Sequence, residues 1–183
     1  MGDSSLTAPA HGCHRILGFD PGTSVTGWGV VDRQGNRYQS AGYGTLRPVK
    51  GESRETRLAW LQDEAETLIQ RASPHRIALE QAFLGKNIQS ALRLGEARGA
   101  LLAAAGRRGV EVVEYPTATV KKAIAGNGRA DKQQLQFMLQ RLLGLADPPK
   151  PLDASDALAL ALALALDFNL RERSVQLRDQ RGP

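Results

Sequence analysis

The chain has 183 residues, of which 42% are hydrophobic, and it carries a formal net charge of +5. This length suits one ordinary domain with a proper core, and the basic balance favours an anionic partner such as nucleic acid. Spare surface lysine and arginine would give the same charge. The single cysteine, Cys13, excludes an internal disulfide and fits a reducing compartment.

No targeting or membrane segment is predicted, so we expect a cytoplasmic protein with no membrane partner. Residues 1–15 lack the apolar core of a signal peptide. The most apolar run, residues 157–166, is far shorter than the ~20 residues that a membrane-spanning helix needs.

The first part of the chain predicts strands at residues 15–19, 28–32 and 38–46. The first strand runs into a turn at Asp20-Pro21-Gly22, and a hairpin turn at residues 33–36 joins the other two. Because the connections are short, we expect an antiparallel meander. Residues 1–14, which precede it, are expected to form a disordered extension.

Helices and strands then alternate. Helical spacing of apolar residues predicts helices at residues 54–72, 88–105, 116–125 and 131–143. Short apolar runs predict strands at residues 76–80 and 110–115. This order predicts an α/β domain over residues 15–170, with a mixed five-stranded sheet and helices on both faces.

Residues 153–169 are ambiguous, because Ala and Leu alternate there as in a strand. Both residues are strong helix formers and the run is long, so we expect a helix that is buried nearly all round. Residues 171–183 are rich in arginine and are expected to form a basic C-terminal tail.

Four carboxylates, Asp20, Glu80, Asp153 and Asp156, lie where a metal site could form. The first two end predicted strands, and the last two share a helix face because they are three residues apart. Clustered like charges are costly unless a cation lies among them, and Mg²⁺ prefers oxygen ligands. The structural alternative is a turn at Asp20, a solvated Glu80 and a capped helix at Asp153 and Asp156.

Several segments then carry a resemblance to a known family. They are residues 16–22 (ILGFDPG), 80–83 (EQAF), 86–87 (KN), 90–99 (SALRLGEARG) and 153–159 (DASDALA). These segments resemble the RuvC crossover junction endodeoxyribonucleases, in order and without large gaps, from about residue 15 to residue 168. The stretch before Arg15 is longer than members of that family usually have.

The resemblance implies an RNase H-like fold and a Holliday junction resolvase that acts in homologous recombination and DNA repair. It implies symmetric, metal-dependent nicking of two opposed strands, which leaves 5′-phosphate and 3′-hydroxyl ends. The four acids match the family's catalytic metal ligands, with one or two Mg²⁺ ions per subunit and Mn²⁺ able to substitute. The implied partners are four-way junction DNA, a second copy of the chain, and the branch-migration proteins RuvA and RuvB.

The same matching points to DNA-binding residues. Phe83 matches an aromatic residue that stacks on unpaired bases, whereas a lone phenylalanine otherwise packs in a core. Lys121 and Lys132 match lysines that hold the DNA backbone near the cut. Weaker candidates for phosphate contact, which could equally lie on a solvated face, are Lys86, Lys122, Arg129 and Arg93. The helix at residues 88–105 is our candidate for the dimer interface, although its apolar stripe could also pack on its own sheet.

Other functions are weighed against this one. Residues 20–24 also resemble the first phosphate loop of actin-like ATPases, but the second acidic-glycine motif of those proteins is not found. A non-catalytic DNA-binding module would not need all four acids. An RNase H-like nuclease acting on RNA hybrids is the nearest rival, and Phe83, Lys121 and Lys132 favour the resolvase.

Overall fold

The computed structural model describes residues 6, 9, 12–22, 24–81 and 88–179, with side chains described up to residue 168. The described elements are five strands and five helices. In chain order they are β1 (His14–Asp20), β2 (Thr26–Gln34), β3 (Arg37–Leu46), α1 (Arg54–Ala72), β4 (Arg76–Glu80), α2 (Ile88–Arg107), β5 (Glu111–Tyr115), α3 (Thr117–Ala125), α4 (Lys132–Leu143) and α5 (Leu152–Asp179).

The strands form one sheet in the order β3-β2-β1-β4-β5. Strand β1 pairs antiparallel with β2, and β2 pairs antiparallel with β3, which is the predicted meander. Strand β4 pairs parallel with both β1 and β5. The mixed five-stranded sheet is therefore confirmed, and its parallel half places the ends of β1 and β4 at one edge.

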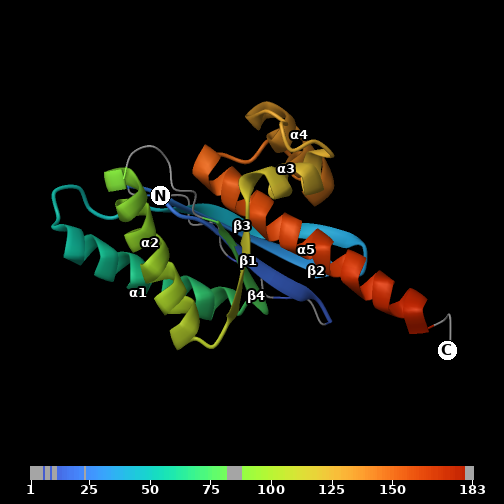
Figure 1. Cartoon of the computed structure of the whole chain (residues 1–183), viewed down its shortest axis with the longest axis horizontal. Helices are drawn as coiled ribbons and strands as arrows, with labels where there is room; N and C mark the ends of the chain where they lie inside the picture. Colours follow the sequence, from blue (N-terminus) through green and yellow to red (C-terminus); the bar gives the residue numbers. More distant parts are fainter. Residues whose placement is uncertain (1–5, 7–8, 10–11, 23, 82–87, 180–183) are drawn as a thin grey trace.

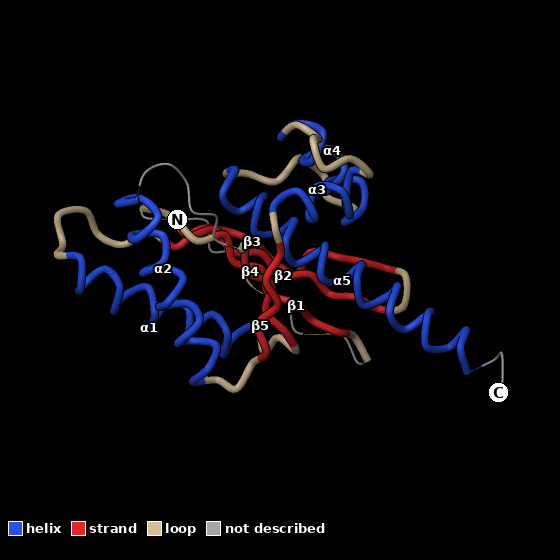
Figure 2. Tube along the Cα trace, in the orientation of Figure 1, coloured by secondary structure: helices blue, strands red, loops and turns tan. Residues whose placement is uncertain are grey.

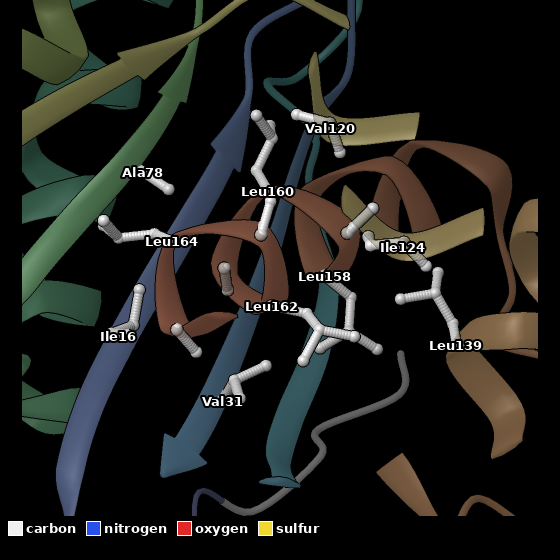
Figure 3. Close-up of a cluster of buried hydrophobic side chains, with 14 of the residues drawn as sticks. Ile16, Val31, Ala78, Val120, Ile124, Leu139, Leu158, Leu160, Leu162 and Leu164 are labelled. Carbon is white, nitrogen blue, oxygen red and sulfur yellow. The ribbon is translucent and has the colours of Figure 1, made fainter. Parts of the chain in front are cut away.

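Helices cover both faces of this sheet, as predicted (Figure 1). Successive strand residues point to opposite faces. In β1, Leu17 and Phe19 pack in a cluster with α1 and α2, whereas Ile16 packs in a cluster with α3, α4 and α5. Figure 3 shows the second cluster, where Ile16, Val31 and Ala78 lie beside α5. The alternation therefore assigns the even-numbered residues of β1 and β4 to the face that α5 covers.

Glycines allow α5 to lie unusually close to β1 and β2. A β-carbon on Gly18 would lie 2.0 Å from the carbonyl oxygen of Ala157, and one on Gly27 would lie 1.9 Å from that of Asp153. Real β-carbons do not approach backbone atoms this closely, so only glycine fits. The beginning of α5 is thus seated directly on the sheet edge that carries Asp20.

Helix α5 is buried nearly all round, as predicted, because every residue from 157 to 165 is buried. The helix ends at Asp179, ten residues beyond the predicted end at residue 169. The added segment contains Leu, Arg, Glu and Gln, which are good helix formers. Its backbone extends past the sheet (Figures 1 and 2). Within the described residues, no helix is long and apolar enough to span a membrane.

Only part of the expected N-terminal extension lies within the described residues. Leu6 is partly buried and packs against the cluster that α1 and α2 form with the sheet. Cys13 is buried, and His14 already belongs to β1. The chain is therefore tied to the domain at these positions ahead of the predicted first strand.

Candidate active site

Asp20 and Glu80 leave the sheet at the same edge and on the same face. Each is the last residue of its strand, and β1 and β4 are parallel neighbours. Ala78, two residues before Glu80, packs in the cluster that contains α5. Because side chains alternate along a strand, both carboxylates are directed to the α5 side.

The first turn of α5 brings the other two acids to this edge. Asp153 and Asp156 lie three residues apart and share a helix face. Together with Asp20 and Glu80 they line one cavity of about 330 Å³. The structure therefore brings together all four carboxylates that the sequence singled out, from β1, β4 and α5.

The crowding of carboxylates changes their protonation. The pKa of Asp20 is raised to about 8, first by burial and then by the negative charges of Glu80, Asp156 and Asp153. The pKa of Asp156 is also raised by burial, and Lys132 opposes this rise with its Nζ 3.6 Å from Asp156 Oδ2. Without a bound cation, the fold therefore holds carboxylates that repel one another close together at this edge.

The donor set fits a hard divalent cation. The described residues contain no ready-made group of three or more His, Cys, Asp or Glu ligands around one point. The four carboxylates nevertheless supply the oxygen ligands that Mg²⁺ and Mn²⁺ prefer. A cation among them would remove the repulsion that raises the pKa of Asp20.

Two residues that sequence reasoning missed hold Glu80 in place. Thr117, the first residue of α3, donates a hydrogen bond from its hydroxyl to Glu80 Oε1. Arg98 of α2 is buried; it donates to the backbone carbonyl of Glu80 and pairs with Glu114 at 2.9 Å. Arg98 could have been noticed in the sequence, because it is a charged residue next to Ala97 in the apolar stripe of α2. The contact of Thr117 with Glu80 could not be predicted from the sequence, because it depends on how the strands and helices are arranged.

The predicted DNA-binding residues fall into three groups. Lys121 and Lys132 line the acid cavity. Lys122 and Arg129 are exposed and are not part of its lining. Phe83 and Lys86 lie outside the described residues, so their roles stay predictions.

A capping box presents Lys132 to the acids. The Asp131 side chain accepts from the backbone N–H of Gln134, and the Gln134 side chain accepts from the backbone N–H of Asp131. This arrangement begins α4 at Lys132 and fixes the direction in which the helix leaves the loop. The capping box thereby fixes the backbone of Lys132 at a position from which its side chain reaches Asp156.

Two solved junction resolvases have a similar fold. RuvC of T. thermophilus in complex with a Holliday junction substrate matches with a TM-score of 0.82 and 31% identity, over 86% of this chain and 96% of that chain. The yeast mitochondrial Holliday junction resolvase Ydc2 matches with a TM-score of 0.64 over 91% of this chain and 86% of that one. Its 14% identity shows the fold alone. Fold and site together define a metal-dependent nuclease of the RNase H-like class.

The family follows from sequence comparison. The family model described as crossover junction endodeoxyribonuclease RuvC matches residues 16–164. The RuvC protein of Magnetococcus marinus is 46% identical over 145 residues, which are 79% of this chain and 80% of that protein. The RuvC protein of Desulfitobacterium hafniense is 44% identical over 158 residues, which are 86% of this chain and 96% of that protein. The chain belongs to the RuvC family of crossover junction endodeoxyribonucleases.

Proposed function

We propose that this chain resolves Holliday junctions in homologous recombination and DNA repair by nicking two opposed strands symmetrically. The observation that carries this proposal is the convergence of Asp20, Glu80, Asp153 and Asp156 on one cavity in a chain of the RuvC family. The proposed products have 5′-phosphate and 3′-hydroxyl ends. The enzyme is proposed to work in the cytoplasm, with residues 15–170 as its nuclease domain and residues 1–14 and 171–183 as extensions.

The four acids are the proposed ligands of one or two Mg²⁺ ions, with Mn²⁺ able to substitute. When bound, such ions supply an activated water and stabilise the leaving oxygen of the phosphodiester. Around them, Thr117 and Arg98 hold Glu80 at the end of β4. Lys121 and Lys132 line the same cavity and can hold the phosphate backbone beside the carboxylates.

The proposed enzyme is a homodimer, because two opposed strands must be cut and each subunit has one acid cavity. Helix α2 suits the interface in its first half. Ala97, Leu101 and Ala104 are buried within the subunit, but Ile88 and Leu92 are 75% and 63% exposed. Sedimentation at micromolar concentration tests the dimer, and a strict monomer on junction DNA would contradict it. RuvA and RuvB are the proposed protein partners.

Labelled synthetic substrates test the activity. A four-way junction, a plain duplex and an RNA–DNA hybrid are each incubated with the protein, with and without Mg²⁺. We expect cutting of the junction alone, and only with the metal. Asp20→Asn should bind the junction and not cut it. Full activity of Asp20→Asn would overturn the site, and preferential cutting of the hybrid would favour the rival nuclease.

The proposed stacking role of Phe83 has a separate test, since it rests on the family resemblance. Phe83→Ala should lose junction cutting and keep its melting temperature. A buried phenylalanine replaced by alanine would instead cost ~3–5 kcal/mol of stability. A large drop in melting temperature would therefore assign Phe83 to the core.

A further inference from the structure

A second cavity lies at the same edge of the sheet but on the face that α1 and α2 cover. It has a volume of about 330 Å³, and its lining includes Gly22 and Thr26 on either side of the turn between β1 and β2. Helix α1 contributes Arg54 and Arg57, and α2 contributes Arg93. Three guanidinium groups from two helices therefore surround a hollow next to the turn that follows Asp20.

The positive charge continues into a neighbouring hollow of about 270 Å³. The two hollows share Ser24, Pro48 and Arg57, and the second adds Arg47 and Lys50. We call the basic residues of both hollows the basic trough; they are Arg47, Lys50, Arg54, Arg57 and Arg93. Among the described lining residues, Glu96 is the one acid. Five positive charges and one negative charge leave a net charge of +4.

One exposed ion pair lies within this lining. Arg54 pairs with Glu96 at 3.3 Å and links α1 to α2, but its side chain is 72% exposed. Exposed pairs of this kind contribute little to stability. The lining of the two hollows carries more positive than negative charge, and like charges held close together repel one another. An anionic ligand would relieve that repulsion.

The trough lies within reach of the acid cavity. Asp20 lines the acid cavity and Gly22 lines the trough, and two residues of chain span at most about 7 Å. One strand of duplex DNA carries a phosphate about every 3.4 Å along the helix axis. A strand that passes over the β1–β2 turn would therefore meet the trough a few nucleotides from the acids.

We propose that the basic trough binds a backbone phosphate of junction DNA, a few nucleotides from the cut. This inference rests on the proposed function. Guanidinium groups form bidentate hydrogen bonds with phosphate oxygens, and the Ser24 hydroxyl is a further donor in the same hollow. Because phosphate contacts carry no base information, the trough fixes the position of the strand and not the cleavage sequence.

Neutralising single arginines tests the trough. Arg57→Gln and Arg93→Gln are compared with Arg37→Gln, which removes the same charge at the opposite end of β3. Junction affinity is measured by fluorescence anisotropy at several salt concentrations without divalent metal. We expect each trough variant to bind about tenfold more weakly, with its log–log salt slope reduced by about 1. Arg37→Gln should bind like the parent chain.

Thermal unfolding shows whether each variant is folded. If Arg57→Gln does not fold, the exposed Arg93 still supplies the test. Trough variants that match the parent chain in both affinity and salt slope would overturn the inference. If the parent chain neither binds nor cuts junctions, the proposed function itself fails, so the two failures are distinguishable.

Inorganic phosphate alone separates a DNA site from a site for a free anion. Its effect on the melting temperature is measured for the parent chain and for Arg57→Gln. A large stabilisation that Arg57→Gln abolishes, together with unchanged junction affinity, would overturn the DNA assignment. Weak stabilisation by free phosphate together with weakened junction binding by the variant would support it.

Discussion

The hydroxyl of Thr117 donates a hydrogen bond to Oε1 of Glu80, so the first residue of α3 fixes the carboxylate that ends β4. From the side of α2, Arg98 donates to the backbone carbonyl of the same glutamate. Side chain and main chain of Glu80 are thus held by different helices. Thr117 shares the acid cavity, whereas Arg98 acts from outside its lining.

Thr117→Val should lower the rate of junction cutting about 10–100-fold, which is the usual cost of removing a group that orients a metal ligand. The valine has a similar shape but cannot donate a hydrogen bond. The Mg²⁺ concentration for half-maximal cutting should rise as well, because Glu80 is then free to turn away. Titration of the cutting rate with Mg²⁺ measures both effects.

Thr117→Ser keeps the hydroxyl and should restore most of the activity. Thr119→Val serves as the matched control, since Thr119 is exposed on the same helix. Equal loss in the valine and serine variants of Thr117 would show that its shape matters and its hydrogen bond does not.

Gly27→Ala should damage the site through the backbone of α5. The new β-carbon would lie 1.9 Å from the carbonyl oxygen of Asp153, so the beginning of α5 must move away from the sheet. That movement carries Asp153 and Asp156 with it. We expect a loss of stability of about 1–3 kcal/mol, typical of overpacking, and a larger proportional loss of cutting.

Gly106→Ala in α2 is the control for this change. A β-carbon there meets nothing within 4 Å, and alanine in a helix is more favourable than glycine by about 0.5–1 kcal/mol. Melting temperature and cutting rate are measured on both variants. An active Gly27→Ala protein with an unchanged melting temperature would mean that α5 lies further from β2 than the structure shows.

The sequence predicted which elements carry the four acids, because local pattern sets those positions. Asp20 and Glu80 end apolar strands, and Asp153 and Asp156 begin a helix of strong helix formers, so their elements could be assigned from neighbouring residues alone. In the structure, the parallel pairing of β1 with β4 brings the ends of the two strands, and with them Asp20 and Glu80, to the same edge of the sheet. The convergence of all four acids therefore depends on this pairing and on the way α5 lies on the sheet, which local pattern does not set.

The parts that sequence reasoning missed depend on contacts between distant segments. Thr117 and Glu80 are 37 residues apart, and their hydrogen bond exists because α3 begins beside the end of β4. The approach of Asp153 to Gly27 depends on how α5 lies across β2, which no local periodicity encodes. The basic trough combines α1, α2 and two loops, so of its residues only Arg93 was a candidate for phosphate contact in the sequence, and its proximity to Arg54 and Arg57 could not be predicted.

The metal-free protein should lose stability as pH rises. The ordinary pKa of an aspartate, 3.8, applies to Asp20 in the unfolded chain. In the folded chain the pKa of Asp20 is about 8, because burial and the neighbouring acids favour the protonated form. A raised pKa contributes stability that is complete below pH 4 and lost as pH rises through about 8. After allowance for solvent screening we expect about 1 kcal/mol, or roughly 2–4 °C in melting temperature.

Melting temperatures at pH 5 and pH 8, with a chelator or with Mg²⁺, measure this loss. Asp20→Asn should flatten the pH dependence without metal, since the asparagine does not titrate. Added Mg²⁺ should restore the stability of the parent chain at pH 8 and have less effect on Asp20→Asn. Parallel pH profiles for the two chains would contradict the assignment of the raised pKa to Asp20.

Lys132→Gln should shift the pH dependence of cutting to higher pH. Burial raises the pKa of Asp156, and the ammonium of Lys132, 3.6 Å from Asp156 Oδ2, lowers it. Without that charge the pKa of Asp156 rises further, so a higher pH is needed to ionise it. Because Lys132 is 61% exposed, we expect only a small shift of the acidic limb toward higher pH.

Single-turnover rates over a range of pH, at one fixed and subsaturating Mg²⁺ concentration, measure the position of that limb. Lys132→Arg keeps the positive charge and should keep the limb near that of the parent chain. If Lys132 serves only to hold the DNA backbone, the glutamine variant will be slower by the same factor at every pH. That result would show that Lys132 does not set the pKa of Asp156 and acts only as a phosphate contact.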